Sequence, residues 1–400
     1  MVVFNPFVPS YKINPHLQYA RLRAAEPVHR SIAMQAWILT RYDDCIAVLR
    51  DPDTFSSDGL NASGQLGDAI REQRATSALG QVQTLLTVDP PAHTRLRGVI
   101  NRAFTPRRVE LLRPRIEAIA QELLDAVPPG GDLELMTAFA QPLPVIVIAE
   151  LLGIPSSDRN RFKRWSNKIA ATTDLLNAED AIMEAREATL ELIDYFNDFI
   201  QARRDEPRDD LISALVAAQQ TEEQLTHEEI LAFAILLLVA GNETTTNLIG
   251  NGTLALLDNP DAFDSLRSHP DHLPAAIEEM LRYDSPVQGV VRIARRDTTL
   301  GTQQIAQGDL LMLMLGAANR DPDQFPDPDR FDVAREANRH LSFGLGPHFC
   351  LGAPLAGIEA EVAFTLLLQR FPNIARGSSD MERGGTLLLR GLTKLPLSVT

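Results

Sequence analysis

A glycine-rich stretch that contains one of only two cysteines constrains this chain more than any other feature. The stretch is Phe343-Gly344-Leu345-Gly346-Pro347-His348-Phe349-Cys350-Leu351-Gly352, and a helical pattern begins at about Ala353. Glycines let a backbone turn sharply and approach a flat, bulky group closely. Just before a helix N-terminus a cysteine is favoured as thiolate, because backbone N–H groups and the helix dipole stabilise its charge. The stretch therefore predicts a loop that presents one reactive sulfur.

Three other interpretations of this stretch can be weighed against a reactive cysteine. A Rossmann dinucleotide fingerprint needs a third glycine where Phe349 stands, and no parallel-sheet pattern precedes the stretch. A zinc site built on His340, His348 and Cys350 has no familiar ligand spacing and lacks a fourth ligand. A buried structural cysteine in a glycine-rich turn is the simplest alternative.

Composition and charge narrow the class of protein. The chain has 400 residues, 44% of them hydrophobic, and a formal net charge of −15. That charge argues against nucleic acid or an anionic membrane as a general partner. Cys45 and Cys350 are too far apart for a disulfide framework, which fits a reducing cytoplasm. Met1–Ser10 has no signal or anchor pattern, and the longest apolar run, Ile230–Ala240, is too short to span a bilayer. We expect a cytoplasmic protein without a membrane anchor.

Hydrophobic periodicity predicts a mainly α fold with small β-sheets, and 400 residues leave room for one large domain or for two to three small ones. Strands around a turn are expected in Val28–Thr40, then a helix at about Asp43–Arg50 and a long polar connection over 56–88. An Asp- and Pro-rich segment, 319–342, is incompatible with a regular helix. Further helices are expected at 93–103, 107–126, 141–152, 158–171, 178–203, 208–220, 227–258, 260–267, 272–283 and 353–370, and further strands at 290–294, 298–301, 309–315 and 386–398.

A second motif lies in the middle of the apolar helix expected at 227–258, which begins at a Thr226/Glu229 capping box. The motif is Ala240-Gly241-Asn242-Glu243-Thr244-Thr245. Its glycine and its threonine hydroxyls weaken the helix, because the hydroxyls can bond back to carbonyl groups. Taken alone, the motif predicts a local kink.

Two pairs of charged residues have the spacing of neighbours on one helix face. Glu279 and Arg282 are three residues apart and can form a bidentate ion pair. His93 and Arg97 are four apart and can hold a carboxylate between them. Taken alone, each pair is equally compatible with an exposed, solvated surface.

Together these motifs resemble the cytochrome P450 family. The cysteine stretch matches that family's ligand loop position for position, and the other motifs follow the family's order between about residues 89 and 352. The resemblance implies a single catalytic domain of residues 1–400 with a P450-like fold. It places haem b between the long central helix and the cysteine loop, with Cys350 as the ligand of its iron. Thiolate ligation favours cleavage of the O–O bond.

The resemblance also implies roles for individual residues. Glu243 and Thr244 would deliver protons to bound oxygen in a groove at Gly241, and adjacent helix residues point about 100° apart, so Glu243 would act through water. Glu279 and Arg282 would form a structural ion pair with Arg330 as its third member, or with Arg335. The expected haem-binding residues are His93, Arg97, Arg292, His348, Phe343, Gly344 and Gly352.

By the same resemblance the chain is a haem-thiolate monooxygenase of secondary metabolism. It would insert one oxygen atom of O2 into a hydrophobic small molecule such as a polyketide, terpenoid, steroid, fatty acid or aromatic compound. Its electrons would come from NAD(P)H through a separate ferredoxin or flavodoxin-type protein. The segment from Arg95 to Arg115 has seven arginines and only Glu110 against them, and it is the expected docking surface for an acidic ferredoxin.

The expected substrate pocket is apolar. It would draw on the segments 56–88, 165–190, Ala234–Ala240 and Pro286–Val291, with Gln288 as a polar group that contacts the substrate. The expected lining residues are Leu237, Leu238, Val287, Val290, Val291, Leu388 and Leu389. Two alternative functions are a peroxide-driven haem-thiolate peroxygenase and a haem protein that only binds ligands. The Glu243-Thr244 pair argues against both.

Overall fold

The computed structural model describes the chain except for residues 1, 76–81, 129, 171–178, 220–224 and 337. The described residues form two compact units, each assembled from segments far apart in sequence. Unit 1 comprises Met1–Arg74, Gly250–Cys350 and Met381–Thr393, and unit 2 comprises Ala75–Ile249, Leu351–Asp380 and Lys394–Thr400.

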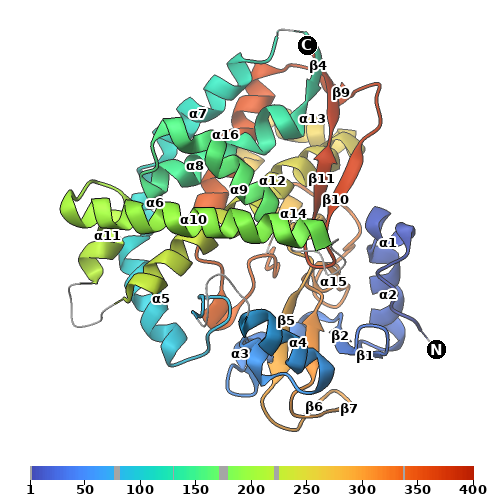
Figure 1. The fold of residues 1–400 in the computed structure, drawn as a ribbon. Coiled ribbons are helices and arrows are strands. Elements are labelled where there is room, and N and C mark those ends of the chain that lie inside the picture. The colour runs from blue at the N-terminus through green and yellow to red at the C-terminus, as the bar shows by residue number, and fades with distance from the viewer. Residues whose placement is uncertain (1, 76–81, 129, 171–178, 220–224, 337) are drawn as a thin grey trace. The chain divides into compact units, whose positions relative to one another are not determined.

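Unit 1 is organised around a five-stranded sheet with the strand order β1-β2-β8-β5-β3 (Figure 1). β2 and β8 are parallel, and the other neighbouring pairs are antiparallel. The strands are β1 (Val28–Ser31), β2 (Ala36–Leu39), β3 (Phe55–Ser56), β5 (Val290–Ala294) and β8 (Leu310–Leu313).

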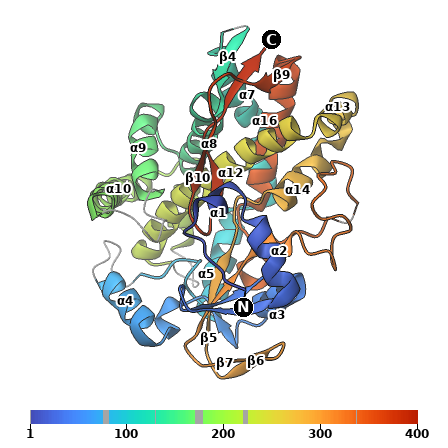
Figure 2. The same cartoon turned by 90° about the vertical axis from the view of Figure 1, so that its right-hand side faces the viewer.

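Both faces of this sheet are covered, since every residue of β2 is buried. Successive strand residues point to opposite faces, and the two cores of unit 1 follow this alternation. Ile38 and Met312 share a core with aromatic residues of α1 (Pro9–Ile13) and α2 (His16–Ala25), which Figure 2 shows beside the sheet. Leu39 belongs to the core on the other face, together with residues of α3 (Tyr42–Arg50).

The remaining elements of unit 1 are short. β6 pairs with β7, and β10 with β11. Their bounds are η1 (Gly59–Asn61), α4 (Gly64–Ala75), α13 (Pro260–Ser268), η5 (Pro270–His272), α14 (Leu273–Tyr283), β6 (Thr298–Leu300), β7 (Gln303–Ile305), α15 (Leu315–Ala318), η6 (Gly346–His348), β10 (Glu382–Gly385) and β11 (Arg390–Lys394).

Unit 2 is mainly helical and has one small sheet, with the strand order β4-β12-β9. α7, α8 and α16 pack together in it (Figures 1 and 2). The bounds are α5 (Ala92–Ala103), α6 (Pro106–Glu110), α7 (Arg113–Asp125), β4 (Gly131–Glu134), the π-helical turn η2 (Met136–Ala140), α8 (Pro142–Leu152), η3 (Ser156–Asp158), α9 (Arg159–Ala170), α10 (Glu179–Asp205), α11 (Leu211–Ala218), α16 (Ala353–Arg370), β9 (Ile374–Arg376) and β12 (Pro396–Val399).

The longest helix, α12 (His227–Asp258), continues from unit 2 into unit 1. The expected capping box is present: the Thr226 amide donates to Glu229 Oε2 at 2.9 Å, and the Glu229 amide to Thr226 Oγ1 at 3.1 Å. Among the described helices, α12 alone is long and apolar enough to cross a membrane, and 61% of its most apolar window is buried within the protein. A core helix of a folded unit has this property.

The structure corrects the sequence expectations in several places. α1 and α2 were not expected, but their prolines stand at helix starts, where the missing N–H removes no hydrogen bond. α4 lies in the segment 56–88 that polarity marked as a connection. The helix expected at 107–126 divides into α6 and α7, because Pro114 is tolerated only in a first turn. Short strands β4 and β9 were missed, and the strand expected at 386–398 is divided between β11 and β12.

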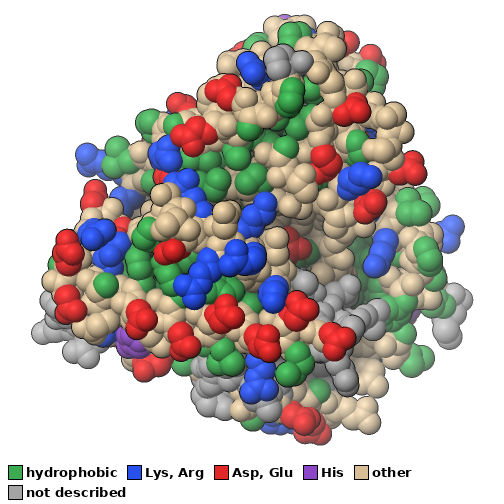
Figure 3. Space-filling model, turned by 45° about the horizontal axis from the view of Figure 1, so that its top comes forward, with side chains coloured by type: hydrophobic (Ala, Val, Ile, Leu, Met, Phe, Trp, Pro, Cys, Tyr) green, Lys and Arg blue, Asp and Glu red, His purple; other side chains and the backbone are tan. Residues whose placement is uncertain are grey.

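Charge is distributed unevenly over α9 and α10. The twelve residues of α9 include five basic and no acidic side chains. Figure 3 shows Lys and Arg side chains gathered in a band beside a row of Asp and Glu. Lys168 Nζ lies 3.6 Å from Glu184 Oε2, and Trp165 Nε1 donates to Glu191 Oε2 at 2.7 Å. These contacts join the two helices.

Candidate active site

The cysteine loop of unit 1 is a tight turn that two left-handed glycines make possible. Gly344 and Gly346 have φ angles of 70° and 74°, which residues with a side chain rarely adopt. A Cβ at Gly346 would lie 2.5 Å from the carbonyl oxygen of Leu49, so the loop passes directly against α3. The Cys350 amide donates to the Phe343 carbonyl at 2.9 Å. The loop is therefore closed by a backbone hydrogen bond between its first residue and the cysteine.

The two cysteines have different environments. Cys45 is fully buried, and this burial, followed by the charge of Asp44, raises the pKa of its thiol far above the usual value. Cys350 is half-buried and stands three residues before α16 begins. Of the two, Cys350 is the more accessible residue.

The donor groups of the described residues fit a cofactor that brings most of its own ligands. No group of three or more His, Cys, Asp or Glu side chains among them could hold a metal ion. A structural zinc needs about four protein ligands, whereas the protein supplies haem iron with axial ligands only. His340 Nε2 lies 3.0 Å from Glu278 Oε2, and His348 Nε2 lies 3.0 Å from Ser57 Oγ. The zinc alternative therefore has no support, and a single accessible thiol fits haem.

The four basic residues among those expected to bind haem are divided between the units. In unit 1, Arg292 of β5 is 8% exposed and donates to the Val291 carbonyl at 2.7 Å. In unit 2, His93 is buried on α5, one turn before the half-buried Arg97, which donates to Asn101 Oδ1 at 3.2 Å. His348 lies within the cysteine loop itself. The described geometry thus gives His93 and Arg97 the shared helix face that their spacing predicts.

The Gly241–Thr246 segment of α12 has two different faces, and the helix runs through it without a break. Asn242 and Thr246 are buried, and they bind neighbouring segments of unit 2 through Ser166 at 2.8 Å and the Ala140 carbonyl at 3.1 Å. A side chain at Gly241 would meet Ile148 of α8 at 2.3 Å, so this glycine also serves packing.

On its other face the same segment is accessible. Ala240 is exposed, and Glu243 and Thr244 are half-buried, although they lie in the middle of a helix with long buried stretches. Thr244 Oγ1 donates to the Ala240 carbonyl at 2.9 Å. With its proton so engaged, the Thr244 oxygen can accept a further hydrogen bond.

Burial raises the pKa of the Glu243 carboxyl to about 7. At neutral pH this acid is therefore divided between its protonated and ionised forms, as an efficient proton donor and acceptor should be. Half-buried, it also keeps contact with solvent. The raised pKa itself could not be read from the sequence, because burial in the folded unit causes it.

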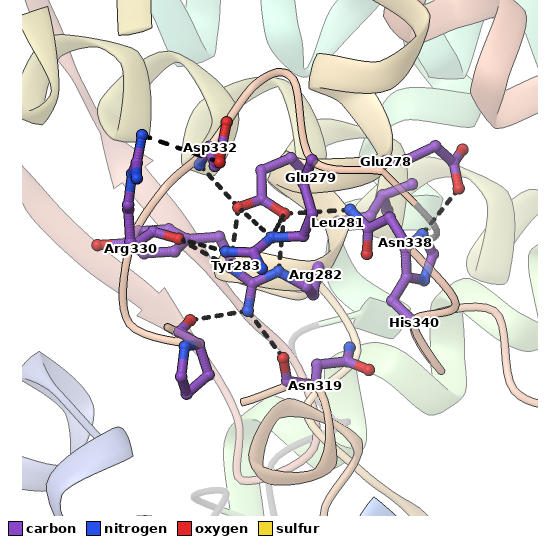
Figure 4. Close-up of polar contacts among 12 residues, drawn as sticks. Glu278, Glu279, Leu281, Arg282, Tyr283, Asn319, Arg330, Asp332, Asn338 and His340 are labelled. Atoms are coloured by element: carbon purple, nitrogen blue, oxygen red, sulfur yellow. Dashed lines mark hydrogen bonds and ion pairs between the residues drawn. The ribbon is translucent and has the colours of Figure 1, made fainter. Parts of the chain in front are cut away.

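The Glu279–Arg282 pair is fully buried in unit 1 (Figure 4). Arg282 Nε and Nη2 donate to the two Glu279 oxygens at 2.7 and 2.8 Å. The third cation is Arg335, whose Nε lies 3.1 and 3.2 Å from the same oxygens. Arg330 was the wrong choice: its side chain is 70% exposed and faces Asp332. Its carbonyl instead accepts from Arg282 Nη2 at 3.1 Å, because the turn directs the backbone of Arg330 inward.

Comparison with known proteins decides the family. The family model described as Cytochrome P450 matches residues 37–383. This chain belongs to the cytochrome P450 family. It is 41% identical to the polyketide biosynthesis cytochrome P450 PksS of Bacillus subtilis, over 100% of this chain and 99% of that protein. It is 40% identical to 6-deoxyerythronolide B hydroxylase of Saccharopolyspora erythraea, over 97% and 96% of the two chains. The solved structure of PksS matches with a TM-score of 0.90 at 40% identity, over 100% of both chains.

Family membership confirms the chemistry and the fold that the motifs implied. This P450 is a monooxygenase with the P450 fold, uses haem b and oxidises a small molecule. Its electrons come from NAD(P)H through separate redox proteins, as in other bacterial P450s.

The residues expected to line the pocket of this P450 differ in accessibility. Val291 is 39% exposed, and Val287, Val290, Leu388 and Leu389 are half-buried. Leu237 is 9% exposed.

Two expectations about the pocket need correction. Leu238 is fully buried, so it packs in the core. Gln288 is also buried, and it is bound to Tyr19 at 3.2 Å and to the Ser285 carbonyl at 2.7 Å, so its amide holds the core of unit 1 together. Of the segment 165–190, residues 171–178 lie outside the described residues.

The arginine-rich surface of the P450 is smaller than the sequence suggests. Arg95 is paired with Glu229, Arg113 with Glu110 and Glu361, and Arg115 with Glu150. Arg107 and Arg108 on α6 form no ion pair in the described part of the chain, and Leu111 just beyond them is 73% exposed. α6 and Leu111 therefore combine positive charge with an exposed apolar side chain.

Glu359 of α16 is a residue that the sequence reasoning missed. It is 1% exposed, and it accepts a hydrogen bond from Thr245 Oγ1 at 3.3 Å, one residue beyond Thr244. Its burial raises the pKa of its carboxyl to about 8. An acid flanked by apolar residues, as in Ile358-Glu359-Ala360, was a signal that could have revealed it.

We expect Glu359→Gln to stabilise the P450 at alkaline pH. A folded-state pKa of about 8 against 4.5 means that the folded chain binds this proton more tightly. The stability that the proton contributes is complete below pH 4.5 and is lost as pH rises through 8. Glutamine is neutral throughout, so the variant should gain up to about 5 kcal/mol at pH 9 and almost nothing at pH 4. Urea unfolding at both pH values measures this gain.

Glu361→Gln is the matched control for that experiment. Glu361 lies two residues further along α16, is half-exposed and pairs with Arg113. Its replacement should produce no gain that grows with pH. An equal response of the two variants would show that Glu359 is not held in its neutral form.

Proposed function

We propose that this P450 oxidises a hydrophobic molecule of the polyketide class, with Cys350 as the ligand of the haem iron. The relatives PksS and 6-deoxyerythronolide B hydroxylase support this substrate class through their names. The apolar and partly exposed side chains of Val287, Val290, Val291, Leu388 and Leu389 support a hydrophobic substrate. Haem supplies the activation of O2 and the transfer of one oxygen atom to the substrate.

We propose that the chain's own groups perform three tasks. Cys350 presents its sulfur, made accessible by the glycine turn. Basic side chains neutralise the propionate carboxylates: His93, Arg97, Arg292 and His348. The half-buried pair Glu243 and Thr244 controls protons. We further propose that residues 1–400 act as a single catalytic domain in the cytoplasm, where Cys350 stays reduced.

The observation that carries monooxygenase chemistry is the pKa of Glu243, which burial raises to about 7. This carboxyl can take a proton from solvent and release it again at physiological pH. Thr244, with its proton directed to Ala240, offers an oxygen that accepts a hydrogen bond. An enzyme driven by peroxide does not need such a proton supply, and neither does a protein that only binds ligands.

Glu243→Gln should therefore lower ferredoxin-dependent product formation by about 100-fold at pH 7. The wild-type rate should fall as pH rises through 7, because less of the Glu243 carboxyl remains protonated, and the variant should lose this pH dependence. Turnover with peroxide, which brings its own protons, should change little. Product and oxygen consumption are measured together over pH 6 to 9.

Glu228→Gln provides the control, since Glu228 is an exposed glutamate in the first turn of the same helix. It should behave as the wild type. If Glu243→Gln slows turnover with peroxide and with ferredoxin equally, Glu243 does not act in proton supply.

We propose that the acidic ferredoxin docks on α6. The double variant Arg107→Glu, Arg108→Glu should reduce the rate of electron transfer by about tenfold at low salt, and this difference should shrink as salt rises. Lys163→Glu, Arg164→Glu makes the same change of charge on α9 and should leave the rate unaltered. Stopped-flow reduction at several ionic strengths measures both, and equal effects would locate docking elsewhere.

The substrate class is tested by a ligand library. Polyketide lactones, fatty acids and steroids are screened for the shift of the haem Soret band that displacement of iron-bound water produces. Hits are then incubated with ferredoxin, reductase and NADPH, and their products analysed. If hydrophilic compounds alone shift the band, the proposal of a hydrophobic polyketide substrate is wrong.

A further inference from the structure

A buried ion pair stands at the point where two expected pocket segments leave the core of unit 1. Asp284 follows α14 and precedes the segment 286–291, and Arg390 opens β11 directly after Leu388 and Leu389. Arg390 Nε donates to Asp284 Oδ1 at 2.6 Å. The two residues are 8% and 7% exposed. Neither side chain is placed to touch a substrate, so any influence on the substrate must act through the backbone.

The backbones of the two segments are bound to each other. The Gln288 amide donates to the Leu388 carbonyl at 2.7 Å, and the Arg390 amide donates to the Pro286 carbonyl at 2.8 Å. An antiparallel bridge joins Val287 to Leu389 between them. A shift of one segment must therefore move the other.

A third residue holds both segments at their origin. Asn251, in the part of α12 that belongs to unit 1, is 2% exposed. Its Nδ2 donates to the carbonyl of Asp284 at 3.1 Å and to that of Arg390 at 3.0 Å. One amide group thus fixes the distance between the two backbone segments at the residues that form the ion pair.

The guanidinium of Arg390 extends this anchoring to the N-terminal segment. Its two terminal nitrogens donate to the carbonyls of Lys12 and Ile13 at 2.7 and 2.9 Å. Burial alone would raise the pKa of Asp284, but Arg390 and then His16 and Arg383 hold this pKa well below its usual range. Asp284 is therefore ionised at neutral pH, where it forms a charge-assisted hydrogen bond with Arg390.

We propose that Asp284, Arg390 and Asn251 are positioning residues that set the separation of the segments 286–291 and 388–389 and so determine which substrates fit. This inference rests on the proposed function, in which those segments line the pocket. Their side chains Val287, Val290, Val291, Leu388 and Leu389 are carried on backbone whose place the three buried residues fix. A displacement of about 1 Å at such a distance from the chemistry can cost about 100-fold in activity.

The decisive variant is Arg390→Lys. Lysine keeps the charge for Asp284, but its ammonium is a single point that cannot reach Asp284 and the two carbonyls of the N-terminal segment in one fixed geometry. Asn251→Ala is the second variant, and it removes only the bridging amide. The control is Arg383→Lys, because Arg383 also lies near Asp284, at 3.4 Å, but has no described bond to either segment.

Two nitrogen ligands of haem iron are suitable probes. Imidazole is small and reports on the haem alone, whereas clotrimazole is bulky and must also fit the pocket. Arg390→Lys and Asn251→Ala should change the Kd of clotrimazole by about tenfold or more, while the Kd of imidazole and the haem content stay within a factor of about two of the wild type. Arg383→Lys should change neither Kd.

The possible results distinguish the positioning role of the three buried residues from the proposed function of the protein. If both variants bind clotrimazole as the wild type does, or if the two Kd values change in parallel, the positioning role is refuted. If Arg390→Lys does not load haem, Asn251→Ala alone tests the positioning role, by the change in its Kd of clotrimazole relative to its Kd of imidazole. If the wild type itself gives no spectral response to imidazole, the proposed haem function fails instead.

Discussion

Cys350→Ser should abolish the red-shifted absorption that thiolate-ligated haem gives when it is reduced and exposed to carbon monoxide. The hydroxyl of serine stays protonated at neutral pH and does not donate electron density to iron as a thiolate does. Product formation should fall to the background of the assay, because the push that favours O–O cleavage is lost. A dithionite-reduced carbon monoxide difference spectrum, together with product analysis, measures both effects.

Cys45→Ala is the matched control for this experiment. It removes the only other thiol of the chain, one that is fully buried and whose pKa burial raises far above its usual value. The variant should lose some stability, about 1–2 kcal/mol for a small cavity, and keep the full thiolate spectrum. A thiolate spectrum that survives in Cys350→Ser and disappears in Cys45→Ala would reverse the assignment of the ligand.

Sequence could predict what rests on local pattern. The glycine turn at 343–352 follows from the left-handed φ angles that only glycine adopts easily, and the Thr226/Glu229 capping box from two reciprocal hydrogen bonds. The long helices were found because burial imposes a period of 3.6 residues on many positions at once. α4 was missed because a short polar helix carries almost no such signal.

Sequence could not predict what depends on contacts between distant segments. The choice between Arg330 and Arg335 was decided by the course of the turn after Pro328, which directs one carbonyl inward and one side chain outward. Gln288 was expected to contact a substrate because its hydrogen-bond partner Tyr19 is far away in the sequence, and no local pattern indicates this contact. The pKa of Glu243 is likewise raised by burial that only the folded unit creates.

Loss of the Glu279–Arg282 ion pair should lower the free energy of unfolding strongly. Both side chains are fully buried, and Arg282 also donates to the carbonyls of Asn319, Pro328 and Arg330 at 2.9, 2.8 and 3.1 Å. Arg282→Met should therefore cost about 3–5 kcal/mol, since it leaves a buried carboxylate with one partner fewer and takes the Arg282 donor from the carbonyls of Asn319 and Pro328, whereas the Arg330 carbonyl still accepts from Arg335 Nη2 at 3.1 Å. Arg282→Lys should cost less, because the charge remains although the fork of donors is lost.

Arg330→Ala is the control, because it shows whether any substitution in this region lowers stability as Arg282→Met should. Its side chain is 70% exposed and lies 3.9 Å from Asp332, so its removal should cost less than about 0.5 kcal/mol. Urea unfolding of the haem-loaded proteins gives the three free energies. Because the pair lies in unit 1 with the cysteine loop, Arg282→Met should also load less haem, whereas Arg330→Ala should load it fully. Equal losses of stability in Arg282→Met and Arg330→Ala would mean that this part of unit 1 is sensitive to any change, and that the buried charge pair contributes no special share.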